Sequence, residues 1–277
     1  MTAIARATRA ELARTFSVRS WWLLALVLFG YVAFTAAILA LFVSDLGALM
    51  GGTPVALDSA ASAMLVYTTV TSIGYLFPVL IGALAATTEL RHRTITPTLL
   101  AEPRRGIVLA GKAIALALVG ALYGLVGLAA SVGTGAAVIA ATGGDPALDD
   151  PNVISVLARI VLAMTLWAVI GVGLGSVVGN QVIVIVIVLA FTQFVEPILR
   201  LVGGLWEGTA QFARFLPGAA TDALVGGGLY ASLGALDPTM PSATTLLDWW
   251  QGGLVLAGFA AVLLAVGSLT SWRRDVT

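Results

Sequence analysis

Six apolar stretches, each about as long as a lipid bilayer is thick, constrain the fold of this chain more than any other feature. They cover approximately residues 21–43, 64–87, 107–141, 153–178, 182–199 and 249–271. A helix needs about 20 apolar residues to cross the hydrocarbon. A lone strand in lipid would leave its backbone without hydrogen bonds, so the run VIVIVIVL at 182–189 is also predicted to be helical. We therefore expect an all-α membrane protein, a single transmembrane domain over residues 1–277.

The composition agrees with this class and excludes several kinds of site. Charged residues make up 10% of the chain, against about 25% in soluble domains. The absence of cysteine excludes a disulfide framework, a thiolate metal site and a cysteine nucleophile. His92 is the single histidine, so a histidine-rich metal centre is excluded as well. The sequence has no GxxxxGK[ST] loop for ATP hydrolysis. We expect no catalytic residue, no metal and no cofactor in this chain.

A basic loop at residues 88–106, between the second and third stretches, sets the orientation. Its cations, with the lysine that follows, are Arg91, Arg93, Arg104, Arg105 and Lys112. Positive charge in short loops is retained in the cytoplasm. With the N-terminus on the same side, eleven of the fourteen Lys and Arg residues are cytoplasmic, and Arg159, Arg200 and Arg214 remain outside. The pattern predicts a multi-pass protein of a bacterial plasma membrane with both termini in the cytoplasm.

Two further segments are expected to lie at the membrane surfaces. Residues 3–20 predict an interfacial elbow helix, in which Leu12 and Phe16 fall on an apolar side while Arg6 falls elsewhere. The alternative is an ordinary basic flank that only sets orientation. Residues 200–248 are rich in glycine and proline. They predict two short helices at the outer leaflet, in a re-entrant or surface segment that must pack against protein.

Several residues within the spans carry more local predictions. Pro78 is expected to kink the second span. The spacing of Gly171, Gly175 and Gly179 favours close approach of another helix, and Asn180–Gln181 is expected to form a tight turn. Glu196 is a candidate functional acid inside the membrane. The interpretation we favour is an interfacial residue paired with Arg200, one helical turn later.

The basic loop also carries a pattern of specific residue types. Glu89 ends the second span, and the basic–Thr pair Arg93–Thr94, Leu99–Leu100, Pro103, Arg104 or Arg105, and Lys112 follow. This order resembles the intracellular-loop signature of ABC-2 type transporter permeases. The sequence departs from that signature at Arg93, where a glycine is frequent, and at Pro97 inside the loop helix. The elbow helix, the six spans and the broken outer segment resemble the same family over nearly the whole chain.

The resemblance implies an ABC-2, type V exporter-like fold and a permease subunit of an ATP-driven transporter. Two permease chains, identical or different, would pair in the bilayer above two separate ATP-binding cassette subunits, which would hold ATP and Mg. The loop and the elbow helix would transmit nucleotide-driven motion. The implied coupling residues are Glu89, Arg91, Arg93, Thr94, Leu99, Leu100, Pro103, Arg104, Arg105 and Lys112, with Arg6, Leu12 and Phe16 on the elbow helix.

The mostly apolar spans favour export of a lipophilic or amphipathic cargo such as a drug, lipid or peptide, and nothing suggests a nucleic-acid partner. The alternative is a self-contained secondary transporter or channel. Such proteins usually show internal repeats or polar sites at the middle of the membrane, and the sequence has no clear internal repeat. A membrane enzyme or a structural assembly protein is a third possibility. The positive charge of the loop would also be explained if the loop only sets the orientation of the protein in the membrane.

Overall fold

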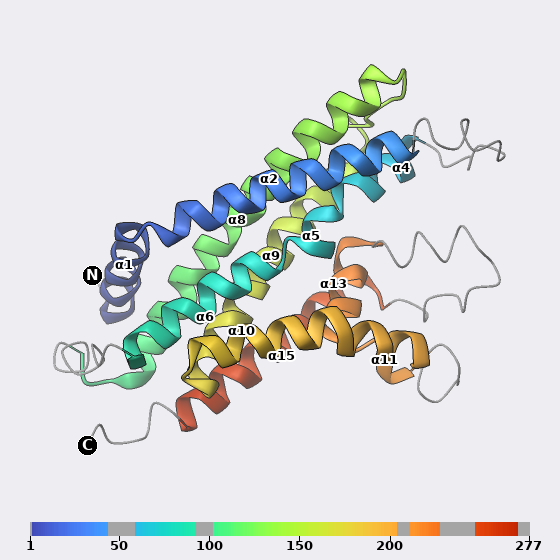
Figure 1. Ribbon diagram of the computed structural model, residues 1–277. Helices are drawn as coiled ribbons and strands as arrows, with labels where there is room; N and C mark the ends of the chain where they lie inside the picture. The colour runs from blue at the N-terminus through green and yellow to red at the C-terminus, as the bar shows by residue number, and fades with distance from the viewer. Residues whose placement is uncertain (1, 44–58, 92–101, 204–210, 228–246, 271–277) are drawn as a thin grey trace.

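Six helical stretches long and apolar enough to cross a membrane dominate the computed structural model (Figure 1). The structure describes residues 2–43, 59–91, 102–203, 211–227 and 247–270, and this part of the chain contains no strand. We call the stretches the first to sixth spans: Ser20–Leu41, Ser59–Thr88, Arg105–Ala141, Pro151–Val178, Gln181–Arg200 and Trp249–Leu269. The predicted all-α multi-pass membrane protein is confirmed, and each predicted span overlaps an observed one.

The spans are built from helices of very different lengths. The uninterrupted spans are α2 (Ser20–Leu41), α8 (Arg105–Ala141), α9 (Pro151–Val178) and α15 (Trp249–Leu269). The second span contains α4 (Ser59–Tyr67), α5 (Thr69–Ile73) and α6 (Leu76–Arg91), and the fifth contains α10 (Gln181–Ala190), η2 (Phe191–Val195) and α11 (Glu196–Gly203). Two shorter helices complete the described chain: α1 (Ala3–Ser17) and α13 (Pro217–Val225).

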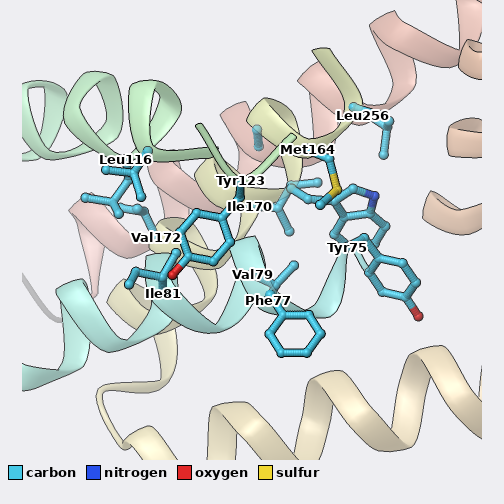
Figure 2. Close-up of a cluster of buried hydrophobic side chains, with 14 of the residues drawn as sticks. Tyr75, Phe77, Val79, Ile81, Leu116, Tyr123, Met164, Ile170, Val172 and Leu256 are labelled. Atoms are coloured by element: carbon cyan, nitrogen blue, oxygen red, sulfur yellow. The ribbon is translucent and has the colours of Figure 1, made fainter. Parts of the chain in front are cut away.

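The centre of the bundle is α9, which packs against α6, α8 and α15. Figure 2 shows apolar side chains that these helices contribute to one buried cluster, among them Phe77, Tyr123, Met164 and Leu256. The first, fifth and sixth spans are only 22%, 17% and 22% buried in their most apolar windows. Their outward faces are apolar, as expected for surfaces that contact lipid.

Glycines let α6 and α9 pack with their backbones almost in contact. A Cβ on Gly82 would collide with the carbonyl oxygen of Ala168, and one on Gly171 with that of Val79. A Cβ on Gly175 would lie 2.7 Å from the carbonyl oxygen of Ala83. The prediction of a close helix approach is therefore confirmed for Gly171 and Gly175.

Gly179, the third glycine of that series, has a different role. It caps α9 in the left-handed conformation, with φ 68°, where a side chain would be strained. Asn180 follows and caps α10, its side-chain oxygen accepting from the N–H groups of Val182 and Ile183. The predicted tight turn at Asn180–Gln181 is confirmed.

Each of the two interrupted spans has a break close to a proline. Pro78 lies in the first turn of α6 and has no N–H to donate to the carbonyl of Gly74, which accepts from Phe77 instead at 3.1 Å. The interruption therefore precedes Pro78, between Ile73 and Leu76. In the fifth span the π-helical turn η2 directly precedes Glu196–Pro197. A π-helical turn of this kind can re-satisfy backbone groups that a proline leaves without a hydrogen-bond partner.

Candidate functional site

The predicted coupling loop connects α6 to α8 at one end of the bundle, where α1 also lies (Figure 1). We call this end the loop end. Arg93, Thr94, Leu99 and Leu100 lie outside the described residues, and Glu89 and Arg91 are placed only as the end of α6. The coupling residues whose side chains the structure describes fall into two groups. Pro103 and Arg104 are exposed and Arg105 is half-buried, whereas Lys112 lies inside the protein.

Among the charged side chains that the structure describes at the loop end, Lys112 is the most deeply buried, with 1% of its surface exposed. Its Nζ donates to Glu11 Oε1 of α1 at 2.6 Å and to the carbonyl oxygen of Ala85 of α6 at 3.1 Å. Arg14 donates to the same Glu11 oxygen at 2.6 Å and to the same carbonyl at 3.3 Å. We call Glu11, Arg14 and Lys112 the elbow cluster. It joins α1 to both helices that flank the loop.

Close backbone packing holds α1 beside the elbow cluster. A Cβ on Gly111, next to Lys112, would lie 2.6 Å from the Cβ of Ala7 and 3.0 Å from the backbone nitrogen of Thr8. On α8 this contact is adjacent to Lys112, and on α1 it lies one turn before Glu11. The α1–α8 joint therefore combines an ion pair with a steric fit, so the two helices can slide little without breaking one or the other.

The side of α1 that faces the bundle is partly polar, which sequence reasoning missed. Glu11 and Thr15 are buried, and Leu12 packs at the edge of the core. Phe16, expected on one apolar side with Leu12, is 42% exposed, as is Ile4, and Arg6 is exposed too. The helix thus buries Glu11 and Thr15 against the bundle and leaves Ile4, Phe16 and Arg6 exposed. Helical periodicity within one segment could not predict this, because Glu11 pairs with Lys112, which lies 101 residues later in the sequence.

A second charged cluster lies on the fifth span, away from the loop end. Arg200 donates to Glu196 Oε1 through Nε at 3.2 Å and Nη2 at 3.0 Å, and to Asp222 Oδ2 of α13 through Nη1 at 2.6 Å. Glu196 Oε1 also accepts the N–H of Ala219 at 2.9 Å, in the first turn of α13. We call Glu196, Arg200 and Asp222 the outer cluster.

The outer cluster agrees with one prediction and extends it. The expected pairing of Glu196 with Arg200 is confirmed. Glu196 is, however, only 4% exposed, so it is a buried residue rather than a solvated interfacial one. Asp222 was not predicted, since it lies 22 residues beyond Arg200 on a separate helix.

No family model and no curated protein matches this chain. The functional assignment therefore depends on the geometry of the two clusters and on the pattern of residues in the loop.

Proposed function

We propose that this chain is the membrane-spanning permease subunit of an ATP-driven transporter of the ABC-2 type. The observation that carries the proposal is the elbow cluster. Glu11, Arg14 and Lys112 bind α1 to α6 and α8, the two helices whose connecting loop carries the ABC-2-like pattern. A load applied to that loop by a docked subunit would reach three helices together. Coupling requires such a stiff contact and two arrangements of the membrane helices that are close in free energy.

The distribution of charge supports a cytoplasmic position for the loop end. The exposed cations on α1 and at the start of α8 include Arg6, Arg9 and Arg104. The other described end carries Asp145, Asp149 and Asp150 in the connection between α8 and α9. Cations concentrate on the cytoplasmic side of membrane proteins. We propose that α1 is an elbow helix at the cytoplasmic surface, with Ile4 and Phe16 facing lipid.

The short helix α13 supports a re-entrant outer segment between the fifth and sixth spans. It contacts α5, α9 and α15, and its residues from Pro217 to Val225 are buried apart from Gly218, which is half-buried. A short helix at membrane depth is tolerated when protein surrounds it in this way. The apolar outward faces of α2 and α10 leave room for a second permease chain as well as for lipid.

In this proposal two permease chains pair above two ATP-binding subunits, which hold ATP and Mg, and the complex exports a lipophilic or amphipathic cargo. The test exchanges the charges of the elbow joint in the reconstituted complex. Glu11→Lys should uncouple transport from ATP hydrolysis, and the double variant Glu11→Lys/Lys112→Glu should restore part of the coupling. If the single variant transports like the wild type, with α1 still folded, the elbow joint does not transmit force.

A secondary transporter is the second candidate, and the outer cluster is the observation that favours it. Charged residues beside interrupted helices are typical of ion-coupled transporters, and Glu196 and Arg200 follow the π-helical turn of the fifth span. Transport by the chain alone, driven by an ion gradient without ATP, would favour this candidate over the permease.

A further inference from the structure

A pocket of about 300 Å³ lies between the two interrupted spans and α13, and neither the loop nor the elbow cluster belongs to it. Its walls come from residues 71–75 of the second span, residues 192–200 of the fifth span and residues 218–222 in α13. It is partly open, and its volume is at the lower end of the range for small-molecule sites, about 300–1,000 Å³. We propose that this pocket binds the protonated amine of an amphipathic organic cation.

The charge of the residues that line the pocket indicates whether it favours a positively or a negatively charged ligand. The charged residues among the described lining are those of the outer cluster, Glu196, Arg200 and Asp222. Two carboxylates therefore share one guanidinium, and with all three ionised they sum to one negative charge. The N–H of Ala219 and the start of α13 compensate part of the charge on Glu196. Asp222, the sixth residue of α13, lies beyond the first turn, to which that effect is confined. A monovalent cation near Asp222 would balance the remainder.

The hydroxyl groups of the pocket favour a hydrogen-bond donor as ligand. Thr71 and Ser72 both donate their hydroxyl protons to the carbonyl oxygen of Thr68, at 3.0 and 3.2 Å. Thr192 donates to the carbonyl oxygen of Val188 at 2.7 Å. A hydroxyl that has donated its one proton can only accept further bonds. An ammonium group offers three N–H donors to these hydroxyl oxygens.

The remaining walls are suited to an apolar body next to the amine. Ile73, Pro197 and the ring of Tyr75 line the same pocket. Tyr75 is held by a tilted ring contact with Trp167, at 4.7 Å between ring centroids. An apolar wall next to a few polar groups is the usual composition of a small-molecule site. The combination selects an amphipathic amine over a bare inorganic ion.

The test uses dansylcadaverine, a fluorescent primary amine with an apolar body, and its N-acetylated derivative, which keeps the body and loses the charge. The full chain is placed in phosphatidylcholine nanodiscs, and titrations at neutral pH are corrected with empty nanodiscs. We expect saturable binding of the amine and at least tenfold weaker binding of the acetylated probe. Equal binding of the two probes, or no saturable binding of the amine, would overturn the proposal.

Variants locate the site on the protein. Asp222→Asn should weaken amine binding about tenfold, as expected for the loss of one charged acceptor. Asp149→Asn makes the same chemical change at an exposed residue outside the pocket and should leave binding unchanged. Ser72→Phe keeps every charge but fills the pocket, and should abolish binding. If size-exclusion chromatography shows that the Asp222→Asn variant is not folded, the Ser72→Phe variant serves as the test. Wild-type affinity in that variant would overturn the proposal.

The binding proposal does not depend on coupling to an ATPase. An amine that binds to the isolated chain in nanodiscs would support the pocket whether the permease assignment stands or fails.

Discussion

Lys112 in α8 and Glu11 in α1 form a buried ion pair of 2.6 Å across 101 residues of sequence. The lysine side chain has no exposed surface, and the glutamate side chain retains about a tenth of its own. A charge buried this deeply is tolerated only when a partner neutralises it. The pair therefore fixes where α1 lies against the third span.

The first prediction concerns the stability of this pair. Glu11→Gln removes the carboxylate from buried Lys112, and breaking a buried ion pair typically costs about 3–5 kcal/mol. We expect a clearly lower melting temperature of the detergent-purified protein, measured by intrinsic tryptophan fluorescence. Glu102→Gln, the same change at a half-buried residue on the loop side of Arg104, is the control and should melt like the wild type. Equal melting temperatures for the two variants would show that the pair contributes little.

The second prediction tests the contact between α6 and α9. A Cβ on Gly171 would collide with the backbone carbonyl of Val79, which cannot move aside as a flexible side chain would. Gly171→Ala should therefore destabilise the protein by about 1–3 kcal/mol, as overpacking does. Gly133 of α8 has nothing within 4 Å of its would-be Cβ, so Gly133→Ala should be neutral or slightly stabilising. A reversed order of the two melting temperatures would contradict the observed helix packing.

A third prediction concerns orientation, and the absence of cysteine makes it simple to test. Ser17→Cys and Asp149→Cys place single thiols at exposed positions on opposite ends of the bundle. A membrane-impermeant maleimide should label the cysteine at position 149 in intact cells. The cysteine at position 17 should react only after the membrane is opened. The reverse pattern would place the loop end outside and remove the basis for docking an ATPase there.

The fourth prediction concerns the guanidinium of the outer cluster. Arg200→Met leaves Glu196 and Asp222 buried near each other without the cation that now binds both. A buried charge without compensation typically costs about 3–5 kcal/mol, so the variant should unfold at a much lower temperature or fail to accumulate. Arg214→Met, outside the ion pairs of this cluster, should accumulate normally. If Arg200→Met is as stable as the wild type, the cluster does not hold α13 against the fifth span.

The sequence was sufficient for those features that depend on short-range patterns. Span positions follow from runs of apolar residues, and the Asn180 turn follows from the local capping chemistry of asparagine. The pair Glu196–Arg200 follows from helical spacing. The expected kink at Pro78 was correct for the region, although the break comes before the proline, because the missing N–H affects the carbonyl four residues earlier.

The long-range contacts could not be read in the same way. No residue near Glu11 in the sequence indicates that Lys112 will pair with it, and periodicity predicted only an apolar side of residues 3–20 for a helix lying on the membrane. Asp222 likewise meets Arg200 only because α13 folds back against the fifth span. These contacts require the three-dimensional arrangement of the helices, which no single segment of this sequence contains.

Co-purification in detergent with candidate ATP-binding proteins encoded beside this chain tests the central claim most directly. The permease account predicts a stoichiometric complex that hydrolyses ATP. It also predicts that altering Glu89 or Arg93–Thr94 lowers transport-coupled hydrolysis while membrane insertion stays intact. A chain that purifies alone and transports in vesicles on an ion gradient, without ATP, would contradict the account.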